Sequence, residues 1–265
     1  MYRAVEESGA PIVSIAGGEP TLHPEIDEIV ARIVAQKRFV YLCTNALLME
    51  RVMKRIPASK YFAFVVHLDG MEEAHDASVY RKGVFKIAVR AIKAGIEQGY
   101  RVTTNTTVFN GSVEEDLVSM FEMLTEMGIE GCNVSPGYQF DSVPNQELFI
   151  SRKNARRVFK NVLDPKRKIR FYNNPLYLEF LRGNRDSQCT AWSNPTYTTM
   201  GWREPCYLIG DKLHAVGQRL AVRRAVGALW RWEGPALRQL HDALRLRVSI
   251  DIRSAQESVG RVQAA

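Results

Sequence analysis

Short apolar runs alternate with amphipathic segments over the first 174 residues of the chain. The runs are rich in β-branched and aromatic residues and end at polar or turn-forming residues, which is the pattern of buried strands. The segments between them repeat apolar residues every three or four positions, as one face of a helix does. The expected strands are 11–16, 39–43, 61–68, 101–108, 131–135 and 168–172, and the expected helices lie near 24–34, 46–56, 83–98, 113–127 and 146–163.

The spacing of the expected strands predicts the fold class. Their centres lie 24 to 38 residues apart, which is the length of one strand and one helix. This rhythm predicts an α/β fold with helices covering a parallel sheet, and both an open doubly wound sheet and a (β/α) barrel satisfy it. A barrel is favoured because polar or turn-forming residues follow nearly every strand, and the carboxyl ends of barrel strands meet at one face. These residues are 17–19, 43–45, 67–70, 105–106, 135–137 and 173–174.

The composition is that of a soluble globular protein. The chain has 265 residues, of which 46% are hydrophobic and 25% charged, and it contains no apolar stretch long enough to span a membrane. The first residues lack the apolar segment of a signal peptide. The four cysteines are too few and too widely spaced for a disulfide framework or a zinc finger. We therefore expect a reduced, cytoplasmic protein. The cysteines are Cys43, Cys132, Cys189 and Cys206.

The positive charge is unevenly distributed between the two parts of the chain. Residues 1–213 carry 27 Lys and Arg against 25 Asp and Glu, whereas residues 214–265 carry nine Arg against four acidic residues and contain no Lys. Since most of the net charge of +7 belongs to the tail, the basic balance is weak evidence for a nucleic-acid partner, and none is expected.

The sequence Gly17-Gly18-Glu19-Pro20 directly follows the first expected strand. Two glycines at a strand end allow the backbone to approach a ligand closely, because no Cβ intervenes. Oxygen atoms at such a turn can accept hydrogen bonds from a cationic amine. The pattern is not the glycine-rich fingerprint of dinucleotide-binding proteins, which opens a helix with a different spacing.

The segment 14–23, which contains Gly17-Gly18-Glu19-Pro20, resembles the corresponding motif of the radical S-adenosylmethionine (SAM) enzymes. In that superfamily the motif ends a strand of a partial (β/α)6 TIM-like barrel and holds the amino group of SAM. Other segments resemble one branch, the adenosyl hopene transferases of hopanoid biosynthesis, and the resemblance covers about residues 1–210. These segments are 39–48, 66–70, 134–138 and 189–196.

The resemblance implies a reaction and its participants. A [4Fe-4S] cluster, reduced by a flavodoxin or ferredoxin, cleaves SAM to a 5′-deoxyadenosyl radical. The radical adds to the terminal alkene of the triterpene diploptene, and quenching of the product radical gives adenosylhopane. An enclosed barrel suits such chemistry, because it keeps water and stray hydrogen donors away from a reactive intermediate.

The resemblance also suggests roles for the residues at the strand ends. Gly17, Gly18, Glu19 and Pro20 match the SAM motif, and Asn105 and Ser135 are candidates for the ribose or carboxylate of SAM, with strand-end capping as the alternative. Cys43 is a candidate hydrogen-atom donor or a small buried apolar residue. His67 and Asp69 are expected either to bind the cofactor or relay protons, or to form a structural pair. The candidate catalytic residues are thus Cys43, His67 and Asp69.

The chain departs from the family pattern at both ends. No cysteine precedes Cys43, so the cluster motif C-x-x-x-C-x-x-C is absent and no metal ligand is assigned. Because residues 2–8 read as the end of an amphipathic helix, the first βα unit is expected to be largely missing. The expected parts are a barrel at 1–174, a family-specific extension at 175–213 and an Arg- and Ala-rich tail at 214–265. The tail reads either as a basic amphipathic helix in peripheral contact with a membrane or as translation out of frame.

Three functions remain open from the sequence. The first is a radical SAM adenosyltransferase that is inactive as written, because it lacks the cluster cysteines. The second is a non-catalytic barrel remnant that binds a lipid or a nucleotide. The third is an ordinary barrel lyase or hydrolase that uses His67 and Asp69 as acid and base.

Overall fold

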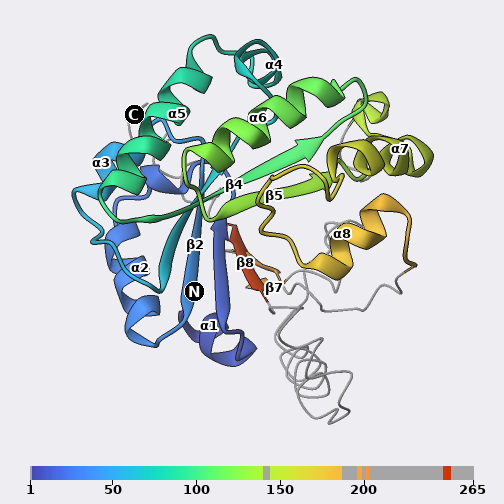
Figure 1. Ribbon diagram of the computed structural model, residues 1–265. Helices are drawn as coiled ribbons and strands as arrows, with labels where there is room; N and C mark the ends of the chain where they lie inside the picture. Colours follow the sequence, from blue (N-terminus) through green and yellow to red (C-terminus); the bar gives the residue numbers. More distant parts are fainter. Residues whose placement is uncertain (1, 140–143, 187–195, 199–200, 203–246, 252–265) are drawn as a thin grey trace.

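The computed structural model describes residues 2–139, 144–186, 196–198, 201–202 and 247–251. Five neighbouring parallel strands form a half-barrel with helices along its outside (Figure 1). This confirms the predicted α/β class and the partial barrel. The five strands are β1 (Ile12–Ala16), β2 (Phe39–Thr44), β3 (Phe62–His67), β4 (Arg101–Val108) and β5 (Gly131–Pro136).

Helices and short 3-10 turns connect and flank these strands. Three of the five expected helices, α2, α5 and α6, match their predicted ranges closely, because their apolar faces repeat with helical spacing. The elements are α1 (Tyr2–Ser8), η1 (Pro20–Leu22), α2 (Ile26–Ala35), α3 (Met49–Met53), α4 (Glu72–Ser78), α5 (Val84–Glu97), α6 (Glu114–Glu126), η2 (Gln146–Leu148), α7 (Arg152–Val162) and α8 (Pro175–Arg182).

Local capping explains where the last two helices begin and end. The expected helix near 146–163 starts only at Arg152, because the Ser151 side chain accepts from the Asn154 N–H and caps α7. The α8 helix, which was not predicted, begins after the Asn174 cap with a proline in its first turn. It ends at Gly183, whose φ of 80° is the left-handed conformation common after a helix.

The expected sixth strand, 168–172, is reduced to a single parallel bridge between Phe171 and Cys132. Two backbone hydrogen bonds hold it, from the Cys132 N–H to the Arg170 carbonyl and from the Tyr172 N–H to the Cys132 carbonyl. The prediction of a full strand is therefore wrong, although the segment does lie beside β5. The chain leaves the sheet after Tyr172 and enters the Asn174 cap of α8.

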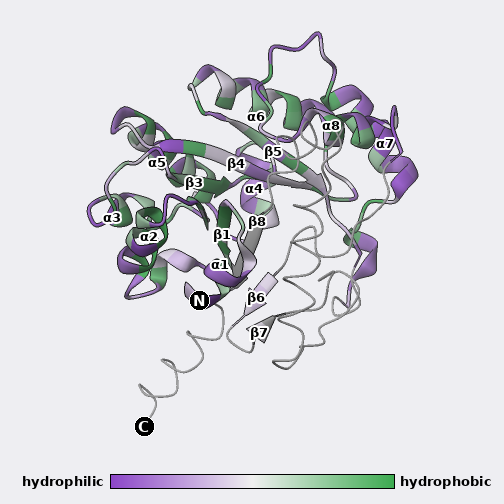
Figure 2. Ribbon diagram, turned by 90° about the horizontal axis from the view of Figure 1, so that it is seen from below, coloured by the Kyte–Doolittle hydropathy of each residue, from purple (hydrophilic) through white to green (hydrophobic). Residues whose placement is uncertain are grey.

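Alternate residues of each strand face the two sides of the half-barrel. The outer side packs against the helices and holds most of the apolar core, including Phe62, Phe64 and Val66. The inner side holds a smaller apolar cluster around Ile12, Tyr41, Ala63 and Val65. Figure 2 shows hydrophobic residues along β1 and β3 and hydrophilic ones over much of the outer helices and loops.

A strand from the C-terminal tail extends the sheet beyond β1. The β8 strand (Arg247–Asp251) pairs in parallel with the whole of β1, with Ser249 opposite Ser14. Two short strands, β6 (Thr196–Thr198) and β7 (Gly201–Trp202), follow it, and the sheet order is β5-β4-β3-β2-β1-β8-β6-β7. The remainder of the tail, with its predicted amphipathic helix, lies outside the described residues.

Candidate functional site

The loop after β1 has a backbone that favours glycine. Gly17 has a φ of 90° and Gly18 a φ of 50°, both in the region that side chains with a Cβ adopt with strain. Gly18 is exposed, whereas Pro20 is buried and starts η1. The loop therefore presents bare backbone at the carboxyl end of the sheet, as expected for a close ligand contact.

The Glu19 carboxylate is bound by the protein itself. Its Oε1 accepts hydrogen bonds from the Thr21 N–H at 3.1 Å, the Thr21 hydroxyl at 2.6 Å and the Thr44 hydroxyl at 2.8 Å. Its Oε2 accepts from the Asn45 N–H at 2.8 Å. Glu19 thus links the loop after β1 to the end of β2, and its hydrogen bonds fix the position of the loop that contains Gly17 and Gly18.

Cys43 and Cys132 occupy opposite sides of the sheet. The Cys43 sulfur is partly exposed on the inner side, 3.5 Å from the Ser14 hydroxyl. Cys132 is fully buried among the outer core residues, and burial raises the pKa of its thiol to about 12, although a hydrogen bond with Thr104 acts in the other direction. Only the first of these two thiols faces the interior where chemistry is expected.

His67 and Asp69 form a close pair at the end of β3. The His67 Nε2 donates to the Asp69 Oδ2 at 2.9 Å, and the Asp69 Oδ1 accepts from the Thr107 N–H at 2.9 Å. The carboxylate is 8% exposed and the imidazole 37% exposed. The Asp69 N–H also donates to the Nδ1 of buried His75, at 3.3 Å. The two residues are hydrogen-bonded, as in the structural-pair alternative, and the contact fixes the imidazole at the mouth of the half-barrel.

The pKa values of His67 and His75 are shifted in opposite directions. Burial lowers the pKa of His67, but the hydrogen bond and charge of Asp69 and a bond to the Asn105 backbone outweigh it, so its pKa lies above the ordinary value. Burial, and then the nearby His67, lower the pKa of His75. His67 therefore contributes its full stabilisation at pH values below its pKa in the unfolded chain, and this contribution is lost as the pH rises through its pKa in the folded protein. The contribution of His75 is instead lost as the pH falls.

Replacing Asp69 by Asn should lower the pKa of His67 below its ordinary value, since burial would remain without the carboxylate. Because His67 is partly exposed to solvent, the expected loss of folding free energy is about 1 kcal/mol near pH 5.5 and smaller near pH 8.5. An NMR titration of the His67 ring protons and urea denaturation at both pH values measure these effects. An unchanged His67 titration would contradict the assigned pairing.

Asn105 and Ser135 both lie on the inner side of the sheet, as their predicted roles require. Asn105 is exposed and is paired in register with His67 on one side and Asn133 on the other. Ser135 lies opposite Thr107, and it is the next inward-facing residue of β5 after Asn133. Three polar side chains on adjacent strands, His67, Asn105 and Asn133, therefore stand in one row. The sequence reasoning missed Asn133, although its place two residues before Ser135 puts it on the same face.

The described residues do not fit an iron–sulfur cluster. They contain no group of three or more His, Cys, Asp or Glu side chains placed to hold a metal. Their two cysteines face opposite sides of the sheet, and Cys189 and Cys206 lie outside the described part. The whole sequence also lacks the C-x-x-x-C-x-x-C spacing. The glycine loop, by contrast, presents backbone that a ligand can approach closely.

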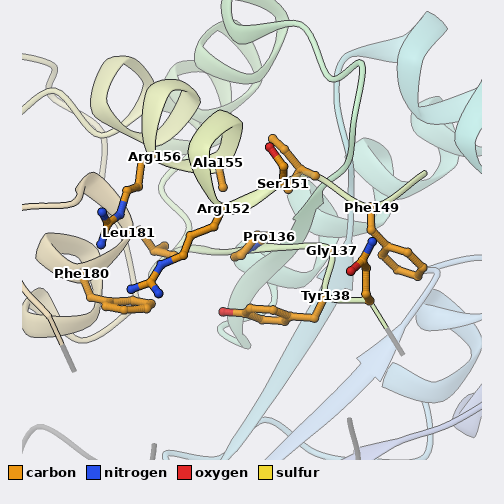
Figure 3. Close-up of a pocket in the computed structure, with 12 residues that line it drawn as sticks. Pro136, Gly137, Tyr138, Phe149, Ser151, Arg152, Ala155, Arg156, Phe180 and Leu181 are labelled. Carbon is orange, nitrogen blue, oxygen red and sulfur yellow. The ribbon is translucent and has the colours of Figure 1, made fainter. Parts of the chain in front are cut away.

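A pocket of about 590 Å³, which the sequence reasoning missed, lies between the end of β5, α7 and α8 (Figure 3). Five apolar side chains line it, from the segment before α7, from α7 itself and from α8. Arg152 and Arg156 of α7 contribute the charged part of its wall. The apolar residues are Phe149, Ile150, Ala155, Phe180 and Leu181.

Two family models match this chain. One describes the radical SAM superfamily and matches residues 1–124, and the other describes a domain of unknown function and matches residues 132–223. In the described part of the chain, none of the helices is both long and apolar enough to cross a lipid bilayer.

Curated relatives match between 44% and 82% of this chain. The Fe-coproporphyrin III synthase of Methanosarcina barkeri is 29% identical over 119 residues, which are 44% of this chain and 30% of that protein. The molybdenum cofactor biosynthesis protein 1 of Mus musculus is 30% identical over 48% of this chain and 20% of its own length. A probable GTP 3′,8-cyclase of Methanosarcina mazei is 26% identical over 82% of this chain and 68% of its own length.

Solved structures share the fold. The Streptococcus suis protein SuiB bound to its precursor peptide SuiA has a TM-score of 0.56 and 20% identity, over 69% of this chain and 43% of SuiB. SuiB bound to S-adenosylmethionine has a TM-score of 0.55 and 19% identity, over 71% of this chain and 45% of SuiB. At this identity the likeness shows the partial barrel and no more.

Proposed function

Because this chain belongs to the radical SAM superfamily, whose cofactors are SAM and a [4Fe-4S] cluster, we propose that its half-barrel binds SAM at the loop Gly17–Pro20. The observation that carries the proposal is the geometry of that loop. Two glycines with positive φ present backbone at the mouth, and the carboxylate behind them is satisfied by Thr21, Thr44 and Asn45. When bound to its cluster, SAM supplies a 5′-deoxyadenosyl radical in this superfamily.

For the substrate, we propose a hopene-type triterpene. Its terminal alkene would accept the adenosyl group only where a [4Fe-4S] cluster is present, and the described residues hold no ligand set for that cluster. The support is the resemblance of residues 39–48, 66–70, 134–138 and 189–196 to the adenosyl hopene transferases. Two of the relatives are named as an Fe-coproporphyrin III synthase and a probable GTP 3′,8-cyclase, and the family model over residues 132–223 is separate from the superfamily model. The part of the chain after the half-barrel is therefore the natural place for a different substrate preference.

Each inner-face residue has a proposed task that does not involve the cluster. The Gly18 backbone meets the amino group of SAM, and Asn105 and Ser135 orient its ribose or carboxylate. Cys43, partly exposed on the inner side, would donate a hydrogen atom to the product radical, and an electron from the flavodoxin or ferredoxin together with a proton would return its thiyl radical to the thiol. The hydrogen bond of His67 with Asp69 holds the imidazole beside Asn105 at the mouth of the half-barrel.

The pair of His67 and Asp69 argues against the ordinary lyase or hydrolase. A general base must be able to take up a proton near neutral pH. The Nε2 of His67 already donates to Asp69 at 2.9 Å, so this nitrogen is engaged by a protein partner and is not presented to a substrate. The match to the radical SAM superfamily favours the first function over both alternatives.

Isothermal titration with SAM tests the proposal. Gly18→Ala should weaken SAM binding by about tenfold or more, because a methyl group would project from the backbone that meets the ligand. Gly9→Ala is the matched control, since Gly9 also has a positive φ, of 64°, and no atom lies within 4 Å of an added Cβ. Both variants should lose about 1 kcal/mol of stability, and only the first should lose SAM affinity.

The substrate is tested separately with the same protein. Detergent-solubilised diploptene and GTP are each incubated with the immobilised chain, and the retained ligand is quantified. Retention of diploptene without GTP supports the triterpene, whereas retention of GTP alone contradicts it.

In the SAM titration, equal SAM affinity of the Gly18→Ala variant and the wild type would contradict the proposed cofactor loop.

A further inference from the structure

The pocket between α7 and α8 is built from elements that the SAM loop does not use. Its lining comes from residues 136–139, 149–152, 155–156 and 180–181, whereas the SAM loop follows β1. A volume of about 590 Å³ is within the range of pockets that hold a small organic ligand. The Tyr138 hydroxyl meets the Tyr177 hydroxyl at 3.1 Å, which joins the loop after β5 to α8 beside the pocket.

Among the residues that the structure describes, two guanidinium groups on one side of the pocket share one exposed acidic partner. Arg152 approaches the Asp186 carboxylate at 3.6 Å and Arg156 approaches it at 3.2 Å. Asp186 is 89% exposed, so solvent screens both ion pairs and a ligand anion can replace it at little cost. Figure 3 shows Arg152 and Arg156 projecting from α7 toward the side of the pocket formed by Phe180 and Leu181.

The position of Arg156 is supported by packing. A Cβ added at Gly183 would lie 3.2 Å from the Arg156 Cδ, so the stem of the arginine lies directly against the end of α8. A side chain held in this way loses little conformational freedom when it binds an anion. Arg152, Arg156 and Lys160 are spaced four residues apart, which places them along one line of α7.

The surrounding segment is the most basic part of the body. Residues 152–170 contain nine Lys and Arg against one Asp. Lys153, Lys160, Lys166 and Lys168 are exposed. Of these cations, Arg152 and Arg156 line the pocket, whereas residues 166–170 follow α7 and lie beside the start of β5, at the other end of that strand.

We propose that the pocket binds an anionic amphiphile, with a phosphate or carboxylate on Arg152 and Arg156 and an apolar body against Phe149, Phe180 and Leu181. An inorganic anion would leave the apolar wall unfilled, and a pure hydrocarbon would desolvate the guanidinium groups without a partner. A membrane lipid and a free fatty acid or alkyl phosphate share the required chemistry. The site is independent of the proposed adenosyl transfer.

Titration with decyl phosphate, decanol and inorganic phosphate tests the two halves of the pocket. Decyl phosphate should bind at least about tenfold more tightly than either of the other two, because it alone satisfies both halves. The double variant Arg152→Gln/Arg156→Gln should lose this preference, whereas Lys153→Gln should keep it. Lys153 is the matched control, since it is an exposed cation of the same helix that does not line the pocket.

Two further measurements distinguish a membrane lipid from a soluble amphiphile, and failure of this proposal from failure of the proposed SAM loop. Flotation with vesicles of phosphatidylglycerol and phosphatidylcholine, lost in the double variant, would assign the site to a membrane lipid. Binding of decyl phosphate without flotation would assign it to a soluble amphiphile. Equal affinities for decyl phosphate and decanol, or no effect of the double variant, would overturn the proposal. SAM titration of the double variant should be unchanged, so failure here is distinguishable from failure of the SAM loop.

Discussion

Replacing Glu19 by Ala is expected to lower the free energy of unfolding by about 2–3 kcal/mol and to abolish measurable SAM binding. The substitution removes the acceptor of four hydrogen bonds, two of them from the backbone N–H groups of Thr21 and Asn45. Without it the loop after β1 is no longer tied to the end of β2, so the glycines lose their fixed position. Urea denaturation and SAM titration measure the two effects.

Comparing Glu19→Gln with Glu19→Ala separates the effect of losing the carboxylate charge from that of losing the side chain. Glu19→Gln keeps one oxygen acceptor but presents an NH₂ group where the carboxylate accepted from the Asn45 N–H, so we expect about half of the loss seen with Ala. Glu25→Ala is the control, because Glu25 is exposed and makes no capping hydrogen bond with its side chain. A Glu19→Ala protein as stable as the Glu25→Ala control would show that the network contributes nothing.

Replacing Arg101 by Ala is expected to destabilise the fold by about 2–3 kcal/mol. The guanidinium donates to both carboxylate oxygens of Glu130 at 2.6 and 2.8 Å and to the Tyr172 hydroxyl at 3.1 Å, and it is 21% exposed. The Tyr172 hydroxyl in turn meets that of buried Tyr41 at 2.6 Å. Arg101 thus links β4 to the short segment that bridges to β5, and its loss leaves Glu130 and Tyr172 without this partner.

Arg90→Ala is the matched control for this prediction. Arg90 also forms an ion pair, with Glu50 at 2.9 Å, but it is 69% exposed, so its removal should cost less than about 0.5 kcal/mol. Urea denaturation of the two variants compares them directly. Equal small losses would mean that the Arg101 contacts are as weak as a surface ion pair.

The periodicity of apolar residues predicted the half-barrel well, because strands and helices that bury one face must repeat with periods of about 2 and 3.6. The five strands from Ile12 to Pro136 follow this rule. The segment 168–172 also looks like a strand, yet it makes one bridge at Phe171 before the chain turns into α8. How many hydrogen bonds such a segment makes to the sheet depends on the direction that the chain takes after it. The local pattern of apolar residues does not encode that direction.

The candidate site was located from strand ends, because the carboxyl ends of parallel strands meet. The sequence placed His67 and Asp69 at one strand end and left open whether they pair or act on a ligand, and the structure shows a hydrogen bond between them. The partners of Glu19 were not predictable in the same way. Thr44 and Asn45 lie 25 and 26 residues away, and only the parallel pairing of β1 with β2 brings them to that carboxylate.

The sequence by itself determined the α/β class, the glycine loop and the absence of the cluster motif, since each depends on residue type and spacing along the chain. Tertiary structure alone decided which side of the sheet each polar residue faces, which groups satisfy Glu19, and that α7 and α8 enclose a pocket with two arginines. The physical reason is that such contacts join residues distant in sequence, and they exist only after apolar burial has packed the helices against the sheet.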